Sequence, residues 1–384
     1  MSGKRGNGEG TIHRRKDGGW CAQYTVYTAE GRRRKTIYGK TRAEVGGKLA
    51  KALSDRHGGL VFDDEGLTLG KYLDKWLEGS LRGAVRQSTF DRYEIAVRVH
   101  TKPILGRLKL TTLAPSHLAG FYLDKLAAGF APASVNKLNV ALHKALDQAV
   151  KWHMIPRNVA EVVKAPRPAP EVIRPLSREQ TKTLLEAARG ERFEPLYVRA
   201  VTTGLRQGEL LGLKWEDVSL EDGVVRVRRT LARHKARLVL GDPKTKRSRR
   251  TVRLTQAAVQ ALEGHFTRQT AQRDILGDLY EHQGLVFATQ RGTLVNPTNL
   301  RKRSFEPLLE KAGLPAIRFH DLRHTCATLL LSRNINHKIV SEMLGHATIA
   351  ITLDTYSHVL PNMQEGTARA LEETLRQRVA VRLQ

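Results

Sequence analysis

Residues 165–170, with the sequence Ala-Pro-Arg-Pro-Ala-Pro, constrain the fold more than any other stretch of the chain. Proline lacks the amide hydrogen that a helix needs and restricts the residue before it, so this stretch cannot be helical. We expect a semi-rigid linker here. Directly after it, Ser177 and Gln180 have the spacing of a capping box, which predicts the start of a new helix. The chain should therefore divide near residue 170, and its 384 residues suit two or three domains.

The residues before the linker suggest two modules. In the first, turns rich in glycine and charge separate β-rich runs at 20–28 and 35–38, which predicts a sheet of two or three strands. A helix should follow from Thr41 to about Leu53, with Glu44 completing a capping box with Thr41. In the second module, residues 67–164, apolar residues recur at spacings of three and four, which predicts a bundle of four or five helices.

The residues after the linker combine helices with one clear β region, 223–254, which has a turn at 241–243. Apolar and cationic residues alternate at its start, as Val225 and Val227 against Arg226 and Arg228. The cations should share one face of a hairpin that could lie along a phosphate backbone. A terminal helix is predicted over 366–378.

The predicted fold class is mainly α with small β elements. It combines an N-terminal three-stranded sheet plus helix, a helical bundle and a mixed α+β domain. The boundaries that we expect are residues 1–60, 66–165 and 171–384.

The charge of the chain indicates its partner. Lysine and arginine number 65 against 38 acidic residues, which gives a net charge of +27 and favours a polyanion such as nucleic acid. No apolar run approaches the roughly 20 residues of a membrane-spanning helix, and the first residues lack the apolar core of a secretion signal. We expect a cytoplasmic, nucleoid-associated chain with no membrane partner. Cys21 and Cys326 are too few for a disulfide framework or a cysteine-rich zinc site, so they should be reduced thiols, and we expect neither cofactor nor metal.

Two motifs after the linker carry residues that suit phosphate chemistry. Arg206 and Glu209 lie one helical turn apart, so the carboxylate can hold the guanidinium, although a surface ion pair would give the same pattern. In the second motif His320 and Arg323 share one face of a helix whose start directs backbone amides toward an anion. Its apolar residues form another face, namely Leu322, Cys326, Leu329 and Leu330. A buried histidine beside a solvated arginine is the alternative.

A third motif places His346 ten residues before Tyr356. Leu344 and Gly345 should end a helix, because glycine permits the left-handed turn of a C-cap. Taken alone, Tyr356 would be a packing residue more often than a nucleophile. Its interpretation as a nucleophile depends on the other two motifs. Cleavage of a phosphodiester without a metal needs positive donors around the phosphate, an in-line nucleophile and an acid for the leaving oxygen.

Together and in this order, the motifs resemble the signature of tyrosine recombinases, the phage integrase family. The signature consists of Arg206, a lysine in a β-hairpin, His320-x-x-Arg323, Leu-Gly-His346 and Tyr356. The resemblance covers residues 175–360. The two upstream modules resemble, more loosely, that family's arm-type DNA-binding module and core-binding domain, and residues 171–384 its catalytic domain.

The resemblance implies a role for each site residue. Arg206 and Arg323 would clamp the scissile phosphate, and His346 would add a hydrogen bond to it. His320 would assist proton removal from Tyr356, which would attack to give a 3′-phosphotyrosine and a free 5′-hydroxyl. Lys244 would protonate the leaving oxygen, with Lys246 as the alternative, although both lysines could simply contact phosphates. Glu209 would have a supporting role, while His324, His337 and His358 are expected to be structural or solvent-exposed.

The resemblance also implies partners. These are double-stranded DNA attachment sites of core and arm type, a homotetramer on synaptic DNA joined through the terminal helix, and DNA-bending and excision factors. The terminal helix could instead close its own domain. Two other functions remain open from the sequence, a type IB topoisomerase and a DNA-binding protein without catalysis.

Overall fold

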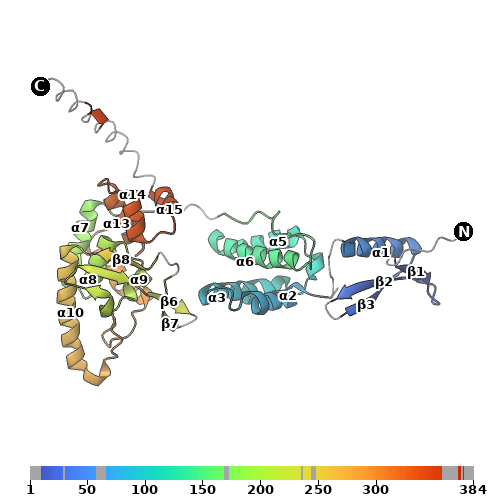
Figure 1. The fold of residues 1–384 in the computed structure, drawn as a ribbon, viewed down its shortest axis with the longest axis horizontal. Helices are drawn as coiled ribbons and strands as arrows, with labels where there is room; N and C mark the ends of the chain where they lie inside the picture. The colour runs from blue at the N-terminus through green and yellow to red at the C-terminus, as the bar shows by residue number, and fades with distance from the viewer. Residues whose placement is uncertain are drawn as a thin grey trace. The chain divides into compact units, whose positions relative to one another are not determined.

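The computed structural model describes residues 10–28, 31–57, 66–167, 173–234, 237–243, 248–356, 371, 372 and 375. The chain divides into two compact units, Met1–Pro170 and Glu171–Gln384 (Figure 1). Each unit is described by itself. The catalytic candidates all belong to the second.

The first unit begins with a three-stranded antiparallel sheet in the order β1-β2-β3. Its strands are β1 (Thr11–Arg14), β2 (Trp20–Thr28) and β3 (Gly31–Gly39), and the helix α1 (Arg42–His57) follows. Val45 and Leu49 of α1 pack with Ala22 and Tyr24 of β2 in a small buried core. The predicted sheet and helix are therefore confirmed. The Thr41 hydroxyl accepts from the Glu44 amide at 3.2 Å, as expected of the N-cap, whereas the Glu44 side chain accepts from the amide of Lys40 at 2.9 Å instead of that of Thr41.

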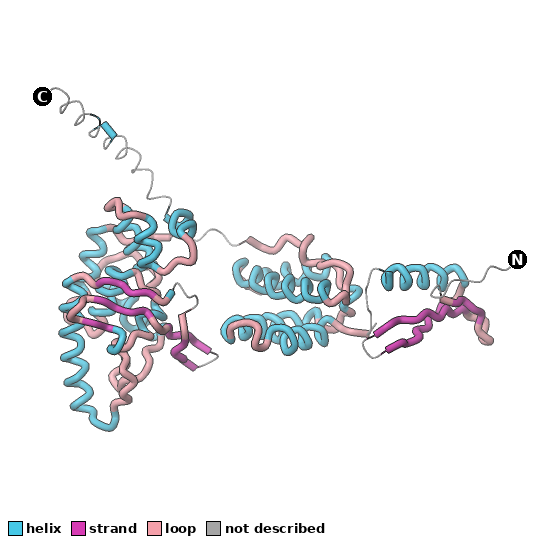
Figure 2. Tube along the Cα trace, viewed as in Figure 1, coloured by secondary structure: helices cyan, strands magenta, loops and turns pink. Residues whose placement is uncertain are grey.

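The same unit continues with a helical bundle, drawn in cyan in Figure 2. Its α-helices are α2 (Leu69–Trp76), α3 (Gln87–Ile95), α4 (Lys102–Leu105), α5 (Pro115–Ala127) and α6 (Pro132–Lys151). Two π-helical segments, Leu77–Leu81 and Ala96–Thr101, extend α2 and α3. One apolar core joins these helices, and it includes Leu138, Leu142 and Leu146, which recur every four residues along α6.

The second unit opens where the sequence predicted. The Ser177 hydroxyl accepts from the Gln180 amide at 3.2 Å and the Gln180 side chain accepts from the Ser177 amide at 2.9 Å, a capping box that begins α7 (Arg178–Ala187). The helices that follow are α8 (Glu194–Thr203), α9 (Gln207–Leu211), α10 (Gln256–Leu276), α11 (Pro297–Leu300), α12 (Glu306–Lys311), α13 (Asp321–Leu331), α14 (His337–Leu344) and α15 (Ile349–Tyr356). A π-helical segment, Arg301–Phe305, joins α11 to α12.

The β region differs from the single hairpin that was expected. One sheet has the order β4-β5-β8, built from β4 (Val218–Ser219), β5 (Val224–Val227) and β8 (Arg250–Arg253). A separate hairpin pairs β6 (Thr230–His234) with β7 (Arg237–Gly241), so residues 241–243 end β7 rather than form the hairpin turn. The expected alternation is present, since Val225 and Val227 are buried while Arg226 and Arg228 are exposed. β5 pairs with β8, which follows it only after β6 and β7, so β6 and β7 form a sheet of their own.

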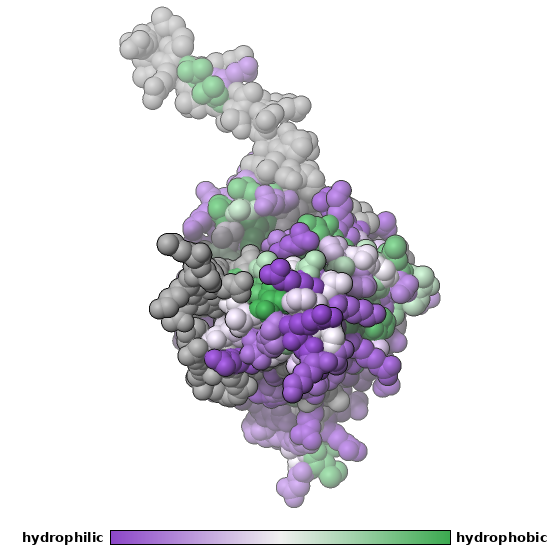
Figure 3. Space-filling view, turned by 90° about the vertical axis from the view of Figure 1, so that its right-hand side faces the viewer, coloured by the Kyte–Doolittle hydropathy of each residue, from purple (hydrophilic) through white to green (hydrophobic). Residues whose placement is uncertain are grey.

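Hydrophilic residues, purple in Figure 3, cover most of the face drawn there, with small scattered apolar patches. None of the described helices is both long and apolar enough to span a bilayer. The expected terminal helix at 366–378 lies outside the described residues, except for helical Leu371, Glu372 and Leu375.

Candidate functional site

Arg206 is held by a carboxylate that is almost completely buried. Glu209, which is 3% exposed, accepts from Arg206 Nη1 at 2.8 Å and from the Arg206 amide at 3.0 Å. The same carboxylate binds Arg250 through contacts of 3.0 and 3.3 Å. Burial raises the pKa of Glu209, but the charges of Arg250 and Arg206 outweigh it, so the pKa is lowered and the group stays ionised. Glu209 therefore fixes both guanidinium groups, whereas the sequence predicted only the pair with Arg206.

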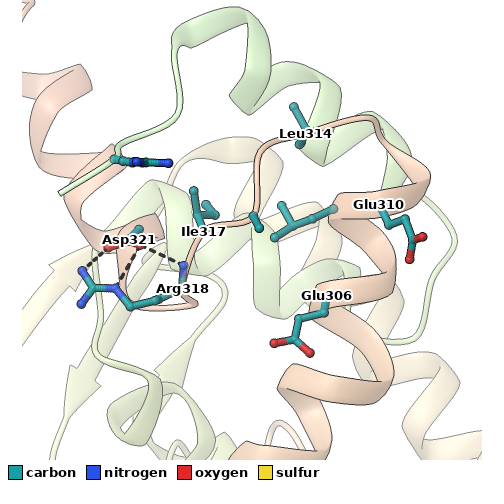
Figure 4. A pocket seen from close by; sticks show the side chains of 9 residues that line it. Glu306, Glu310, Leu314, Ile317, Arg318 and Asp321 are labelled. Carbon is teal, nitrogen blue, oxygen red and sulfur yellow. Dashed lines mark hydrogen bonds and ion pairs between the residues drawn. The ribbon is translucent and has the colours of Figure 1, made fainter. Parts of the chain in front are cut away.

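The second motif is fixed at the start of α13. Asp321 accepts from the Arg318 amide at 2.8 Å and from the Arg318 guanidinium at 2.7 and 3.2 Å (Figure 4). This places His320, which is exposed, at the N-cap position of α13. A cavity of about 740 Å³ lies beside this helix start, between Glu306, Ile317 and Asp321, and none of the predicted site residues lines it.

Arg323 joins all three motifs. Its Nη1 donates to the carbonyl of Gly204, two residues before Arg206, at 2.7 Å, and to the carbonyl of Leu344 at 2.8 Å. Arg206 Nη2 donates in turn to the carbonyl of Gly345 at 3.3 Å. Arg323 is only 3% exposed, which contradicts the alternative of a solvated arginine. Segments far apart in the sequence therefore meet around these two guanidinium groups.

One donor of this arrangement has no partner. Arg323 Nη2 is buried and makes no hydrogen bond within the described part of the chain. Burial and the charges of Arg206 and Arg250 lower the pKa of Arg323 to about 9, while Glu209 opposes the shift. The group is still a cation at neutral pH. A buried cation with an unused donor favours an anionic ligand, because an unpaired charge is costly to bury.

His346 is placed by the end of α14. Gly345 has a φ of +68° and caps α14 in the left-handed conformation, as predicted. His346 Nδ1 lies 2.8 Å from the hydroxyl of Thr352, which is fully buried in α15, so Nε2 is the ring nitrogen that this contact does not use. Burial and the charges of Arg323 and Arg206 lower the pKa of His346 to about 4. The ring is neutral at pH 7.

Tyr356 ends α15 and is 1% exposed. Its hydroxyl oxygen lies 2.9 Å from Nδ1 of His324. Burial raises the pKa of Tyr356 to about 12, and the charge of Arg323 acts against this rise. His324 was expected to be structural or exposed. The signal that could have found it is its spacing of four from His320, which puts both histidines on one side of α13.

Lys244 and Lys246 lie outside the described residues, as does His358. His337 begins α14, and its Nε2 is buried without a hydrogen-bond partner among described atoms. His320, by contrast, lies beside the site, because its ring centroid is 5.1 Å from that of His324. Partial desolvation of the ring by its neighbours and the charges of Arg323 and Arg206 lower the pKa of His320.

One group in the described residues has the spacing of a metal site. His143, Asp147 and Glu161 offer ligand atoms within 4.8 Å of one another. This group belongs to α6 and the segment after it, in the first unit, whereas Arg206, Arg323, His346 and Tyr356 belong to the second.

Comparisons with known proteins identify the family of this chain. Residues 174–363 match the Phage integrase family, and residues 68–126 match the N-terminal SAM-like domain of phage integrases. A protein of Caldanaerobacter subterraneus subsp. tengcongensis described as "Tyrosine recombinase XerC-like" is 32% identical over 359 residues, 88% of this chain and 92% of the relative. An "Integrase" of Streptomyces ambofaciens is 30% identical and covers 95% of this chain and 96% of its own length.

The fold also matches solved structures. The Tn1549 transposon integrase, in complex with a circular intermediate DNA, superposes with a TM-score of 0.68 over 80% of this chain and 99% of that one, at 22% identity. A lambda integrase fragment bound to a core site has a TM-score of 0.54 at 20% identity, over 75% of this chain and 94% of that one. At these identities the likeness establishes the fold. Together with the sequence relatives, it shows that this chain belongs to the phage integrase family and is a tyrosine-type site-specific DNA recombinase.

Proposed function

We propose that this chain cuts and rejoins DNA at attachment sites of a phage or mobile element through a covalent bond between Tyr356 and a backbone phosphate. The observation that carries the proposal is the position of Arg323, whose Nη1 binds the carbonyls of Gly204 and Leu344 while its Nη2 has no partner among described residues. The three motifs meet at this side chain. Its unused donor is a natural contact for an anionic oxygen.

The chemistry of the site fits a phosphodiester. Guanidinium groups bind phosphate oxygens with two parallel hydrogen bonds, and Arg206 and Arg323 are both held in place by neighbouring oxygens. His346 is neutral and would donate from Nε2 to a further phosphate oxygen. These donors stabilise the charge that develops in the transition state. The phosphotyrosine bond stores the energy of the broken link, so rejoining requires no nucleotide.

Lys244 completes the proposed set as the acid for the leaving 5′-oxygen, with Lys246 as the alternative. Both follow β7 and precede β8, the strand that carries Arg250. The segment between β7 and β8 therefore starts and ends on strands of the second unit. Its C-terminal end leads into Arg250, which is held by Glu209.

The proposed partners follow from the relatives and from the charge. The solved Tn1549 and lambda integrases are DNA complexes, and a net charge of +27 suits the same ligand here. We include in the proposal core-type and arm-type attachment sites, a homotetramer on synaptic DNA, and accessory DNA-bending and excision factors. Action on chromosomal DNA would place the chain in the cytoplasm with the nucleoid. The relatives give no support to a topoisomerase or to a non-catalytic binder.

Replacement of the nucleophile tests the proposal. Tyr356→Phe removes only the hydroxyl, so covalent capture of a nicked suicide substrate should fall below detection while the Kd for the same DNA changes by less than about twofold. Capture is measured as a protein–DNA band that survives denaturation.

Tyr280→Phe is the matched control, because Tyr280 lies in the same unit outside the site, and it should capture DNA at the wild-type rate. Capture by Tyr356→Phe at the wild-type level would remove Tyr356 from the proposed role.

A further inference from the structure

The side chain that contacts the hydroxyl of Tyr356 is not the histidine that the family resemblance indicated. Nδ1 of His324 lies 2.9 Å from the phenol oxygen, whereas His320 faces the edge of the His324 ring with centroids 5.1 Å apart. A base must lie within about 2.6–3.2 Å of the oxygen whose proton it takes. We propose that His324 is a catalytic residue, the group that accepts the proton of Tyr356 during strand cleavage. The inference rests on the proposed function of Tyr356.

The position of His324 suits this role throughout the reaction. Arg323 lies on the same helix, α13, and its charge acts on the His324 ring, so an acceptor at His324 lies near the guanidinium that would hold the phosphate. Tyr356 exposes 1% of its surface, and DNA binding therefore has to uncover the phenol before attack. His324 is carried by α13 and does not depend on the segment that follows Tyr356. The proton acceptor is thus carried by the helix of Arg323 rather than by the helix of Tyr356.

The proposed step balances in both directions. The Tyr356 O–H bond breaks and its proton moves to Nδ1 of neutral His324, while the phenol oxygen forms a bond to phosphorus. The bond from phosphorus to the 5′-oxygen breaks, and that oxygen takes a proton from an acid, for which Lys244 is the candidate. On rejoining, the 5′-hydroxyl returns its proton to the same acid and its oxygen bonds to phosphorus. The bond from phosphorus to the phenol oxygen breaks, and the imidazolium of His324 gives its proton to that oxygen.

The surroundings keep His324 ready to accept. Burial, the neighbouring ring of His320 and the charges of Arg323 and Arg318 lower the pKa of His324 to about 4, and only Asp321 acts in the other direction. The ring is neutral at pH 7, so Nδ1 can carry a free lone pair. A bound phosphodiester would add a negative charge beside it, which favours the protonated form. The exposed ring of His320 lies 5.1 Å from that of His324, between centroids, and would help the proton to leave.

Single-turnover capture of the nicked suicide substrate, at saturating protein, tests the role of His324. His324→Ala should lower the capture rate by about 10²–10⁴-fold and leave the Kd for DNA within about twofold. Free imidazole should restore part of the rate in His324→Ala, because it can occupy the vacated space and accept the proton. It should restore nothing in Tyr356→Phe.

His324→Gln separates proton transfer from positioning. Glutamine can hydrogen-bond to the phenol, but it is not a base at neutral pH, so its rate should match that of His324→Ala. His282→Ala, an exposed histidine of the same unit, should behave as wild type. The unfolding midpoint of each variant shows whether the second unit is intact.

Two results would overturn the inference. The first is a His324→Gln variant that keeps a third or more of the wild-type capture rate. The second is a pair of observations: imidazole fails to restore the capture rate of His324→Ala, but it does restore that of His320→Ala. Either result would leave the proposed function standing as long as Tyr356→Phe is inactive. If Tyr356→Phe captures DNA, the proposed function fails first.

Discussion

Some side chains of the site can be predicted from their spacing in the sequence, and others cannot. Arg206 with Glu209, and Gly345 before His346, are close in sequence, and the structure confirms the pair and the cap. Arg250 was missed, although it is 8% exposed and binds Glu209 and the carbonyl of Met343. It stands among many other cations in the sequence, and nothing local distinguishes it.

Arg199 of α8 is the residue whose burial is hardest to explain. It is 0% exposed, and none of its three guanidinium nitrogens has a hydrogen-bond partner within the described ranges. Burial lowers its pKa to about 10, so the group is still charged at pH 7 and its desolvation is not offset. Arg199→Leu should therefore stabilise the second unit by about 1–4 kcal/mol. The measurement is the midpoint of urea unfolding at constant slope.

Arg189→Leu is the control for this change. Arg189 is exposed in the same unit, and its replacement should change the free energy of unfolding by less than about 0.5 kcal/mol. A destabilisation of more than about 1 kcal/mol by Arg199→Leu would mean that the buried guanidinium has a stabilising partner.

At the level of elements, the site depends on how α13, α14 and β8 are joined. Arg323 of α13 binds the carbonyl at the end of α14, and Arg250 of β8 binds the carbonyl of Met343 in the same helix. The C-cap of α14 therefore carries two of the contacts that position His346. The helices themselves were predicted from their caps and apolar spacing, whereas these connections between elements were not.

Gly345→Ala should disturb this junction. A Cβ at Gly345 would meet Arg250 Nη1 at 2.9 Å, and the φ of +68° is unfavourable for alanine. We expect a loss of about 1–3 kcal/mol in the free energy of unfolding. We also expect slower covalent capture, because the shift of Arg250 disturbs Glu209 and hence Arg206. Thermal unfolding and single-turnover capture measure the two effects.

Gly264→Ala is the matched control, since Gly264 lies inside α10 and its nearest neighbour is the end of the flexible Arg268 side chain. Alanine there should be neutral or stabilise the unit by up to about 1 kcal/mol. Equal stability of Gly345→Ala and wild type would show that the C-cap does not fix the site.

At the level of the whole molecule, the chain has two compact units, while the sequence predicted three functional parts. The division into residues 1–60, 66–165 and 171–384 stays a prediction. The N-terminal sheet supports a separate DNA-contacting role through its exposed cations, Arg14, Arg15, Lys16 and Arg34.

Deletion of residues 1–60 tests that division. The shortened chain keeps the bundle core and the catalytic site, so cleavage of core sites should stay within about threefold, while binding to arm-type DNA should weaken about tenfold or more because phosphate contacts are lost. Gel-shift and capture assays on separate arm and core duplexes measure both.

Full-length protein with Arg14→Ala, Arg15→Ala and Lys16→Ala is the control, and its arm binding should weaken in the same direction without any change in the sheet. Loss of core cleavage in a well-folded deletion variant would contradict the three-part division.

The sequence by itself determined the local features of this protein. The capping box of Ser177, the left-handed cap at Gly345 and the burial of Val225 and Val227 each depend on residues within a few positions of one another. Backbone preferences and the periods of helix and strand are local, so their patterns can be read directly.

Only the tertiary structure decided which groups meet. The separate pairing of β5 with β8, the contacts of Arg323 with Gly204 and Leu344, and the hydrogen bond between His324 and Tyr356 all join distant residues. Such contacts depend on how several elements pack at once. A local sequence pattern does not specify which distant residue a buried side chain will contact.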